Sequence, residues 1–357
     1  MTVKNKIIIA IDSWKGCLTS AEANQAAAVG ISRLYPDAQV LQVPVSDGGE
    51  GWLDAFHASW GGERVRLYTS DPLLHPVRAH YLLKGDTAVV EIAQALGFTL
   101  LKPKERNPLK TSSFGLGQLM AHAVRNGARH FIVGLGGSAT SDCGMGMLMA
   151  LQNEFPPMDS DFFFGPFPFE VTIATDVQNP LCGPQGAARV FAPQKGATPE
   201  MVEVLEQRAL EFAEESAQSM GRDCRNLPGA GAAGGLGYAF MQYLGAECRS
   251  GVELLLETIH FSDMLNGASL VVTGEGRADK QTLMGKLPFG ILQAAQAQGV
   301  PTVLLAGQVA DKEALLQAGF SQVECINPPG LPLEEAMKKE VAVRGLEGYT
   351  GPVPMQP

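Results

Sequence analysis

The stretch that decides the fold is KIIIAIDSWKG at residues 6–16. Its first six residues are rich in β-branched side chains, which predicts a buried strand, and the polar turn after them leads into an alanine-rich helical pattern over 20–34. A second strand is predicted at 39–43, followed by a glycine-rich turn and a helix over 52–60. This alternation of strand and helix predicts parallel strands joined by crossover helices.

The pattern changes between residues 64 and 92, where short strands separated by turns predict antiparallel pairing. The middle of the chain then mixes both element types, with helices predicted at 113–126, 144–152, 198–219 and 232–244 and strands at 130–134 and 171–175. Alternation returns at the end, with strands predicted at 268–273, 302–305 and 322–326 and helices at 286–298 and 311–318.

The two alternating ends predict a discontinuous domain in this α/β chain. We expect residues 1–62 and 265–345 to complete one doubly wound parallel sheet, because a single closed arrangement hides edges that two half-sheets would expose. Residues 63–264 would form an inserted α/β domain with a mixed sheet, and residues 346–357, which are rich in glycine and proline, a tail.

Composition narrows the range of partners and compartments. The chain has 357 residues, a formal charge of −10 and a pI near 5.2, which oppose non-specific binding to nucleic acid or to an anionic membrane. Its six cysteines form no CxxC pair and its six histidines show no zinc-ligand spacing. Unpaired thiols, with no signal peptide or membrane span evident at the N-terminus, predict a cytoplasmic protein.

Two polar loops, of which the second is rich in glycine, follow the first two predicted strands, at the sheet edge where open α/β sheets bind ligands. Ser13 and Lys15 lie in the first loop, where Lys15 is a candidate ligand for phosphate or carboxylate; the alternative is a solvated lysine in a turn. Asp47 and Glu50 lie in the second loop and suit metal coordination or binding of a substrate hydroxyl. A capping box made by the same two side chains is the structural alternative.

Two further loops are rich in glycine. Residues 134–142 lie between a strand and a helix, so their small residues predict a nest of amides for phosphate, with a surface loop as the alternative. Residues 229–235 match the dinucleotide pattern GxGxxG, but Leu227 and Pro228 precede them where a strand is required. Close helix packing or another amide nest is the preferred interpretation of that segment.

Charged residues gather after the strand at 268–273. Glu275, Arg277, Asp279 and Lys286 supply the two carboxylates and two cations that a phosphoryl-transfer site with Mg²⁺ needs. The alternative is that Arg277 and Asp279 only pair with each other on the surface. The sequence contains no Walker A motif and none of the protein-kinase signatures, so the common phosphotransferase folds do not explain this group.

These loops are similar to the motifs of class I glycerate kinases. The opening motif DSWKGCLT at 12–19 and the second motif VPVSDGGEG at 43–51 both resemble that family. Six further stretches follow in family order and extend the resemblance from residue 6 to about 310: GGSAT at 136–140, TDVQNPL at 175–181, PQKGA at 193–197, PGAGAAGG at 228–235, SGVEL at 250–254 and TGEGR at 273–277.

The resemblance implies an ATP-dependent kinase that phosphorylates D-glycerate, usually at the 2-hydroxyl, on a flavodoxin-like domain joined to a second α/β domain. Phosphoryl transfer depends on positioning and charge neutralisation, which suggests a role for each polar residue of these loops. Phosphate or the glycerate carboxylate would be bound by Ser13, Lys15, Gly136, Gly137, Ser138, Lys195 and Lys286. Mg²⁺ would be bound by Glu275 and Asp279, the developing charge by Arg277, and the substrate hydroxyl by Asp176 or Asp47.

Two other functions stay open at this point: a kinase for another small hydroxy acid or polyol, and a non-catalytic sensor of nucleotides or metabolites. The sensor is favoured only by residues 147–171, a segment shorter than in the family that contains Phe162, Phe163 and Phe164. Trp14 and Cys17 also stand where the family more often has Phe or Tyr and a hydroxyl residue, and Cys143 where it has a small residue. We expect a monomer or a homodimer whose partners are small molecules.

Overall fold

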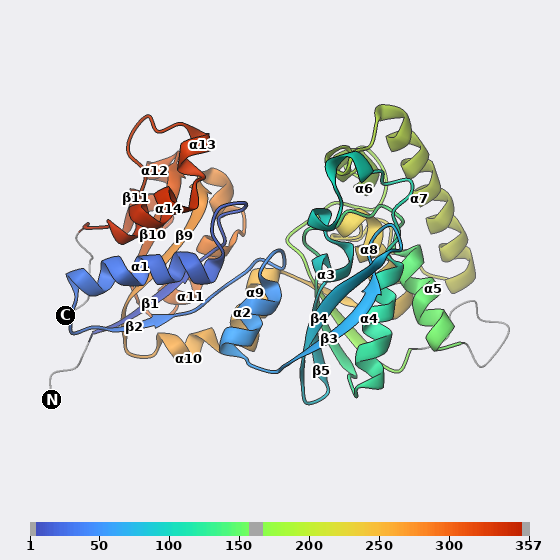
Figure 1. Cartoon of the computed structure of the whole chain (residues 1–357), viewed down its shortest axis with the longest axis horizontal. Helices are drawn as coiled ribbons and strands as arrows, with labels where there is room; N and C mark the ends of the chain where they lie inside the picture. Colours follow the sequence, from blue (N-terminus) through green and yellow to red (C-terminus); the bar gives the residue numbers. More distant parts are fainter. Residues whose placement is uncertain (1–4, 157–166, 352–357) are drawn as a thin grey trace. The chain divides into compact units, whose positions relative to one another are not determined.

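The computed structural model describes residues 5–156 and 167–351, which form two compact units (Figure 1). Among the described residues, unit 1 comprises residues 5–47, 54–61 and 252–351, and unit 2 comprises residues 48–53, 62–156 and 167–251. The three phenylalanines at 162–164 lie outside the described residues. None of the described helices is both long enough and apolar enough to cross a membrane.

Unit 1 contains a five-stranded sheet in which every neighbouring pair is parallel. The strands are β1 (Lys6–Ile11), β2 (Gln39–Gln42), β9 (Ala268–Ala278), β10 (Thr302–Val309) and β11 (Gln322–Cys325), in the order β11-β10-β9-β1-β2. Read from the other edge this is the 2-1-3-4-5 order of flavodoxin-like sheets. The prediction that both ends of the chain share one doubly wound sheet is therefore confirmed.

Helices cover both faces of this sheet. The helices of unit 1 are α1 (Ser20–Leu34), α9 (Gly251–Thr258), α10 (Phe261–Leu265), α11 (Leu287–Gln296), α12 (Lys312–Gln317), α13 (Leu333–Ala336) and α14 (Lys339–Glu347). Ile7, Ile9 and Ile11 of β1 pack in one apolar cluster with α1 and α14, and Leu304 of β10 packs in another with residues of α11 and α12. Burial from both sides explains why β1 is continuously apolar.

Unit 2 contains a mixed six-stranded sheet, as predicted. Its strands, in spatial order, are β3 (Glu63–Ser70), β4 (Pro76–Lys84), β5 (Thr87–Glu91), β6 (His130–Gly134), β7 (Glu170–Ala174) and β8 (Glu247–Arg249). The pairs β3–β4 and β4–β5 are antiparallel, whereas the remaining pairs are parallel. The switch in pairing falls where the sequence pattern changes from short strands to strand and helix alternation.

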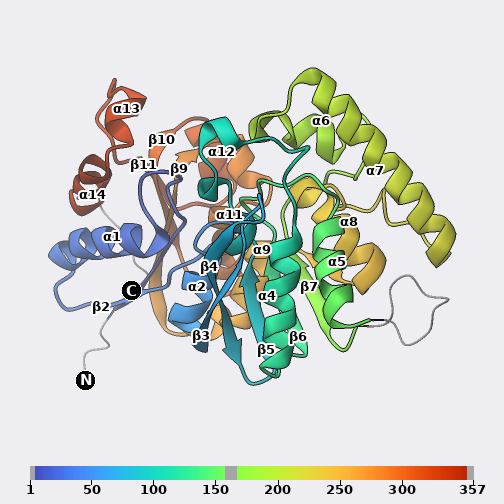
Figure 2. The same ribbon diagram turned by 45° about the vertical axis from the view of Figure 1, so that its right-hand side comes forward.

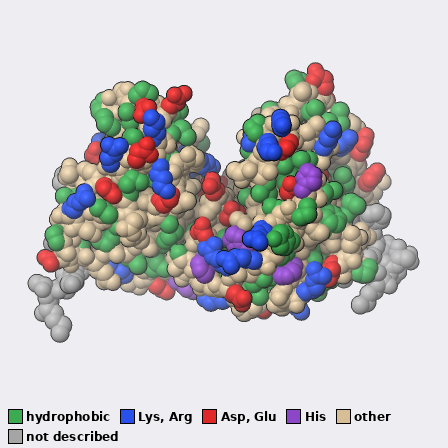
Figure 3. Space-filling view, in the orientation of Figure 1, with side chains coloured by type: hydrophobic (Ala, Val, Ile, Leu, Met, Phe, Trp, Pro, Cys, Tyr) green, Lys and Arg blue, Asp and Glu red, His purple; other side chains and the backbone are tan. Residues whose placement is uncertain are grey.

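The main helices of unit 2 are α4 (Phe114–Arg125), α5 (Met145–Glu154), α7 (Pro199–Met220) and α8 (Ala232–Leu244), with shorter α3 (Ala93–Leu96) and α6 (Ala187–Phe191). Helices α4 and α5 lie side by side against the sheet, as Figure 2 shows. The segment Trp52–Ser59 forms α2, which the division of units splits after Leu53. Acidic and basic side chains are interspersed over the face drawn in Figure 3.

The glycine-rich start of α8 is a tight bend rather than a regular helix. Ala233, Gly234 and Gly235 have φ values of 53°, 73° and 90°, in the left-handed region. A side chain at Gly234 would collide with the carbonyl oxygen of Thr140, so the segment packs directly against the loop at residues 134–142. The structure therefore gives residues 229–235 a role in close packing. It offers no support for reading their GxGxxG pattern as a dinucleotide-binding motif.

Three boundaries differ from the predicted domains. Residues 252–264 group with unit 1, because Val252 packs against Gly290 of α11 and α10 also contacts α11. Residues 48–53 group with unit 2, where the amide of Gly136 donates to the Gly48 carbonyl. The predicted tail begins too early, because Leu346 and Tyr349 are buried in the cluster that covers β1.

Candidate functional site

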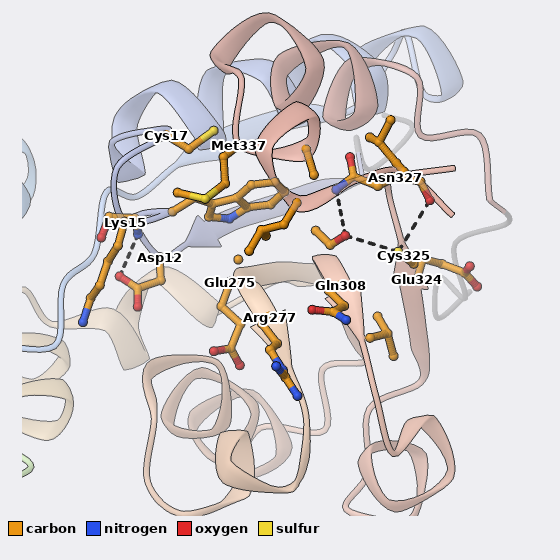
Figure 4. Close-up of a pocket in the computed structure, with 18 of the residues that line it drawn as sticks. Asp12, Lys15, Cys17, Glu275, Arg277, Gln308, Glu324, Cys325, Asn327 and Met337 are labelled. Atoms are coloured by element: carbon orange, nitrogen blue, oxygen red, sulfur yellow. Dashed lines mark hydrogen bonds between the residues drawn. The ribbon is translucent and has the colours of Figure 1, made fainter. Parts of the chain in front are cut away.

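The strand order of unit 1 marks the expected ligand site. The chain reverses its direction of winding between β1 and β9, and open α/β sheets bind ligands at the carboxyl ends of such a strand pair. A cavity of about 1080 Å³ lies at this edge and is lined by residues of unit 1 alone (Figure 4). Six of the predicted site residues line it: Ser13, Lys15, Asp47, Glu275, Arg277 and Lys286.

Lys15 is held at the corner of a tight turn. The amide of Cys17 donates to the carbonyl of Trp14 at 2.7 Å, and the amide of Trp14 donates to Leu18 at 2.8 Å. Gly16 follows Lys15 with φ of 75°, the left-handed value that a type II turn requires at its third position. The turn therefore leaves the Lys15 side chain exposed at the cavity and fixes its backbone.

Asp12 is the residue that the sequence-based site predictions missed. It directly follows β1, lines the same cavity, and its Oδ1 accepts a hydrogen bond from the Ser13 amide at 2.7 Å. Burial of its carboxyl group, reinforced by the negative charge of Asp47, raises the pKa of Asp12 to about 8, although the Ser13 amide and Lys15 oppose the shift. A charged residue directly after an apolar strand at the switch point was the signal that could have identified it.

Glu275 lies in β9 and is buried at the cavity wall. Its Oε1 accepts a hydrogen bond from Thr282 Oγ1 at 2.6 Å, and its Oε2 pairs with Lys286 Nζ at 3.3 Å. Burial raises the pKa of Glu275, while the Thr282 hydroxyl and Lys286 oppose the rise. The structure thus brings Glu275 and Lys286 together as a partly buried ion pair.

Arg277 and Asp279 form the surface pair that was the alternative interpretation. Arg277 Nε lies 3.2 Å from Asp279 Oδ2, and Asp279 Oδ1 accepts a hydrogen bond from the Gln281 amide as the cap of a short 3₁₀ helix (Lys280–Leu283). Asp279 is absent from the cavity lining, whereas Arg277 belongs to it. Asp279 therefore has a clear structural function at the end of β9.

The glycine-rich loop of unit 2, at residues 134–142, is held by hydrogen bonds to other segments of the unit. The Gly136 amide donates to Gly48 at 3.0 Å, and a side chain at 136 would collide with the backbone of Gly49. The Ala139 amide donates to Leu96 at 2.8 Å. Gly136 is therefore a close-packing residue whose N–H is engaged, which removes it from the predicted amide donors to phosphate and leaves Gly137 and Ser138.

Lys195 is buried against this loop, with only 4% of its surface exposed. Its Nζ donates to the carbonyl oxygen of Thr140 at 2.6 Å and lies 3.5 Å from Ser138 Oγ. Burial lowers the pKa of Lys195 to about 8, and the charge of Asp142 opposes the shift. The side chain therefore fixes the loop through its carbonyl group, a role that the sequence did not reveal.

Asp176 follows β7 and is exposed. Because β6 and β7 are parallel neighbours, this residue and the loop at residues 134–142 follow the same edge of the unit 2 sheet. Among the residues that the structure describes, no three side chains of His, Cys, Asp or Glu are grouped closely enough to hold a metal ion. The predicted pair Glu275 and Asp279 does not form a ready metal site, since protein donors already engage both carboxylates.

Unit 1 has a flavodoxin-like sheet with carboxylates and lysines at its switch point, and unit 2 is a mixed α/β unit with a glycine-rich loop. These features suit a phosphotransferase of the α/β class. Comparison with known proteins supports this description. The model of the glycerate kinase family matches residues 7–161 and 167–347. The chain therefore belongs to the glycerate kinase family.

Individual relatives are similar over almost the whole chain. A glycerate kinase of Bacillus subtilis is 39% identical over 356 residues, covering 93% of both chains, and a glycerate 2-kinase of Escherichia coli is 36% identical with the same coverage. A crystal structure assigned to glycerate kinase 2 of Salmonella typhimurium LT2 has a TM-score of 0.80 and 36% identity, and covers 97% of this chain. These findings confirm the predicted fold class and the predicted phosphotransferase activity on glycerate.

Proposed function

We propose that the chain transfers the γ-phosphoryl group of ATP to the 2-hydroxyl of D-glycerate and releases ADP. The kinase family supports the use of ATP, and one relative is named as a 2-kinase. The observation that carries the proposal is the group formed by Asp12, Asp47, Lys15 and Lys286 around one cavity at the switch point of the unit 1 sheet. Phosphoryl transfer needs cations that neutralise charge and a carboxylate that orients the attacking hydroxyl.

Asp12 is the carboxylate that we assign to the attacking hydroxyl. A general base works best when its pKa lies near the working pH, and burial gives Asp12 that property. The Ser13 amide fixes Oδ1 and thereby the orientation of the carboxyl plane. In this role Asp12 replaces Asp176 and Asp47, the residues predicted from the sequence.

Lys15 and Lys286 supply positive charge on the same cavity. Lys15 is exposed at a rigid turn, so it can approach a phosphate without losing a structural contact. Lys286 is already paired with Glu275, an arrangement that holds its ammonium group at the wall. We assign both to the phosphates, with Arg277 at the same wall as a further cation for the developing charge.

In unit 2, we assign an anionic group of a substrate to the loop at residues 134–142, with the amides of Gly137 and Ser138 as donors. Lys195 positions that loop rather than neutralising a phosphate directly, because its Nζ donates to Thr140. Asp176 remains a predicted substrate-binding residue.

Mg²⁺ is proposed only as an ion carried by the phosphates of ATP. Mg²⁺ is usually held by one or two carboxylates together with substrate phosphates and waters, so it does not require a preformed cluster. This agrees with the contacts of the two carboxylates, because Glu275 accepts a hydrogen bond from Thr282 and Asp279 pairs with Arg277. No step of the reaction is assigned to an ion held by the protein. A cytoplasmic location and a monomeric or homodimeric state remain predictions.

The test is an assay of the purified chain with ATP, Mg²⁺ and D-glycerate. We expect formation of ADP and a product that enolase accepts directly, because enolase uses the 2-phosphate and not the 3-phosphate. Rates with L-glycerate, glycolate, tartronate and glycerol measure the preference for the acceptor. A product that enolase accepts only after addition of a mutase would place the phosphoryl group on the 3-hydroxyl, and binding of either ligand without turnover would favour the sensor.

A further inference from the structure

The glycine-rich loop at residues 134–142 has a fixed direction at Ser138. The amide of Phe98 donates to the carbonyl oxygen of Gly137 at 3.0 Å. Because the C=O and N–H groups of a trans peptide point in opposite directions, the N–H of Ser138 points away from Phe98. This amide is one of the two that we assign to an anionic group of a substrate. Its direction therefore depends on the residues that hold the loop in place.

Asp142 lies at the end of this loop and accepts four hydrogen bonds. Its Oδ2 accepts from the amide and the hydroxyl of Ser113, at 2.7 and 2.8 Å, and from the Gly146 amide at 3.2 Å. Its Oδ1 accepts from the Gly144 amide at 3.2 Å. Ser113 directly precedes α4, and the two glycines lie at the start of α5. A negative charge is favoured at helix N-termini, so Asp142 ties the loop to the first turns of both helices.

Ser113 joins the same network from the α4 side. It is fully buried, and its Oγ accepts from the Met147 amide at 2.9 Å while it donates to Asp142. Helices α4 and α5, which lie side by side in Figure 2, also approach closely, because a methyl group on Gly117 would lie 2.4 Å from the carbonyl oxygen of Met147. Neither helix can shift without disturbing this network, so two packed helices fix the position of the Asp142 carboxylate.

Lys195 holds the same loop at a second point. Its Nζ donates to the carbonyl oxygen of Thr140 at 2.6 Å. Burial, the largest effect, lowers the pKa of Lys195 to about 8, whereas the negative charge of Asp142 and, to a smaller extent, Cys143 raise it. Hydrogen bonds from charged donors are about twice as strong as those from neutral donors. The charge of Asp142 therefore favours the form of Lys195 that binds the loop more tightly.

We propose that Asp142 is a positioning residue of the reaction and fixes the loop at residues 134–142 in the conformation that binds D-glycerate. The proposal rests on the proposed function, which assigns a substrate anion to this loop. Because the phosphates of ATP are assigned to Lys15 and Lys286, the carboxylate of glycerate is the anionic group that remains. Asp142 acts through α4, α5 and Lys195 rather than on the substrate, since protein donors engage both of its oxygens.

The experiment measures which substrate responds to a change at Asp142. Wild type, Asp142→Asn and Ser113→Ala are assayed with one substrate varied and the other saturating. Asparagine keeps the shape of the side chain but replaces one oxygen by an NH₂ group, which cannot accept from the Gly144 amide. We expect Asp142→Asn to raise the KM for D-glycerate about tenfold and to lower kcat about tenfold, because small errors in substrate position cost up to about 10²-fold. The KM for ATP should change less than about twofold.

The charge of Asp142 provides a second measurement, which a purely structural role would leave unchanged. In wild type the KM for D-glycerate should rise above about pH 8, where Lys195 loses its proton. Without the negative charge the pKa of Lys195 falls, so in Asp142→Asn this rise should begin about one pH unit lower. Ser113→Ala keeps the charge and should raise the KM about threefold without moving the pH dependence. Carbon NMR of isotope-labelled lysine follows Lys195 itself, whose signal is identified by its absence in Lys195→Met.

Asp86→Asn is the matched control, because Asp86 is an exposed carboxylate of the same unit in the turn before β5. It should leave both KM values and the pH dependence unchanged. The inference is overturned if Asp142→Asn leaves the KM for D-glycerate or the pH dependence unchanged, or raises the KM of both substrates equally. If Asp142→Asn fails to fold, Ser113→Ala decides: a raised KM for D-glycerate alone supports the inference, and an unchanged one overturns it.

Failure of the proposed function is recognised separately. Absence of product from wild type with ATP and D-glycerate overturns that function. Calorimetry of D-glycerate binding then tests the inference by itself. Weaker binding to Asp142→Asn than to wild type supports the positioning role, and equal binding, or none to either, overturns it.

Discussion

Two lysines, Lys15 and Lys195, were both predicted to bind phosphate or the glycerate carboxylate, and the structure gives them opposite surroundings. Lys15 is exposed at the corner of a turn and lines a cavity. Lys195 is buried and its ammonium group donates to the main chain of the loop at residues 134–142. A lysine near a phosphate-binding loop can therefore act on the ligand or on the loop, and its burial decides which.

Among the variants that test this comparison, we expect the largest effect at Asp12, a carboxylate that lines the same cavity as Lys15. Asp12→Asn should lower kcat/KM by about 10²- to 10⁴-fold, the usual contribution of a general base. Since the wild-type carboxyl group must be ionised, kcat/KM should rise with pH and level off above about 8, and the variant should lack this rise. Rates measured between pH 6 and 9 decide, with Asp37→Asn on the exposed surface as the control.

The contribution of Asp12 to the free energy of unfolding should fall as pH rises, whereas its contribution to kcat/KM should rise. The folded state raises the pKa of Asp12 from an ordinary value near 4 to about 8, so the folded chain binds more protons than the unfolded chain between these values. The free energy of unfolding contributed by Asp12 is thus lost as pH rises through that window. Asp12→Asn should melt at a higher temperature than wild type at pH 8, and a lower melting temperature would contradict the assigned cause.

Lys15→Ala should lower kcat/KM by about 10²- to 10³-fold with an unchanged melting temperature, because an exposed ligand lysine has no packing role. The control is Lys110→Ala, another exposed lysine outside the cavity. Near-normal turnover in Lys15→Ala would show that Lys15 does not act on the ligand. A large loss of melting temperature would show that Lys15 is structural, like Lys195.

Lys195→Met should alter stability more directly than chemistry. Removal of the ammonium group leaves the buried Thr140 carbonyl without its donor, at a cost of about 1 to 3 kcal/mol. Burial lowers the folded-state pKa of Lys195 to about 8, so the unfolded state binds more protons between about 8 and 10.5 and this residue contributes increasing stability across that range. The difference in unfolding free energy between wild type and variant should therefore grow in favour of wild type as pH rises from 8 to 10.5. A difference that does not depend on pH would mean that Lys195 is ordinarily solvated.

The smallest effect is expected for Asp279→Asn. Asparagine also caps helices, so the variant should lose only the ion pair to the exposed Arg277 side chain, worth about 1 kcal/mol. Turnover and the Mg²⁺ requirement should change less than about threefold. A much raised Mg²⁺ requirement would show that Asp279 is a metal ligand. The ligand-binding residues of unit 1 would then include the end of β9.

Much of the fold could be predicted from the sequence because its signals are local. The apolar run of β1 and the alternation at both ends predicted a shared parallel sheet, and the change of pattern at residue 64 predicted the antiparallel strands. The ends of β9 and β10 were set too early, since Gly274, Gly276 and Gly307 weaken the strand signal although ladder pairing continues past them. The short strand β8 was missed because its polar residues depend on a neighbour for pairing.

The site was predicted less completely for a physical reason. Loop motifs identify which residues follow strand ends, and six of those residues do line one cavity. Burial of a single charged group, however, is a property of the packed chain, so neither the proton affinity of Asp12 nor the enclosed position of Lys195 is visible in a motif. The hydrogen bond from the Gly136 amide to the Gly48 carbonyl likewise depends on a contact between segments far apart in sequence.

The pairing of β1 with β9 has a consequence for how the chain is made. Lys6 of β1 pairs with Ala268 of β9, so β1 waits for the synthesis of about 260 further residues before its neighbour on that side exists. At about 5 to 20 residues per second, the wait is roughly 13 to 50 s. The strands of unit 2 all emerge earlier and can pair within that time. We therefore expect unit 2 to fold first during translation, and the nascent KIIIAI segment, with its high tendency to form intermolecular β-structure, to be the part of the chain that most needs a chaperone.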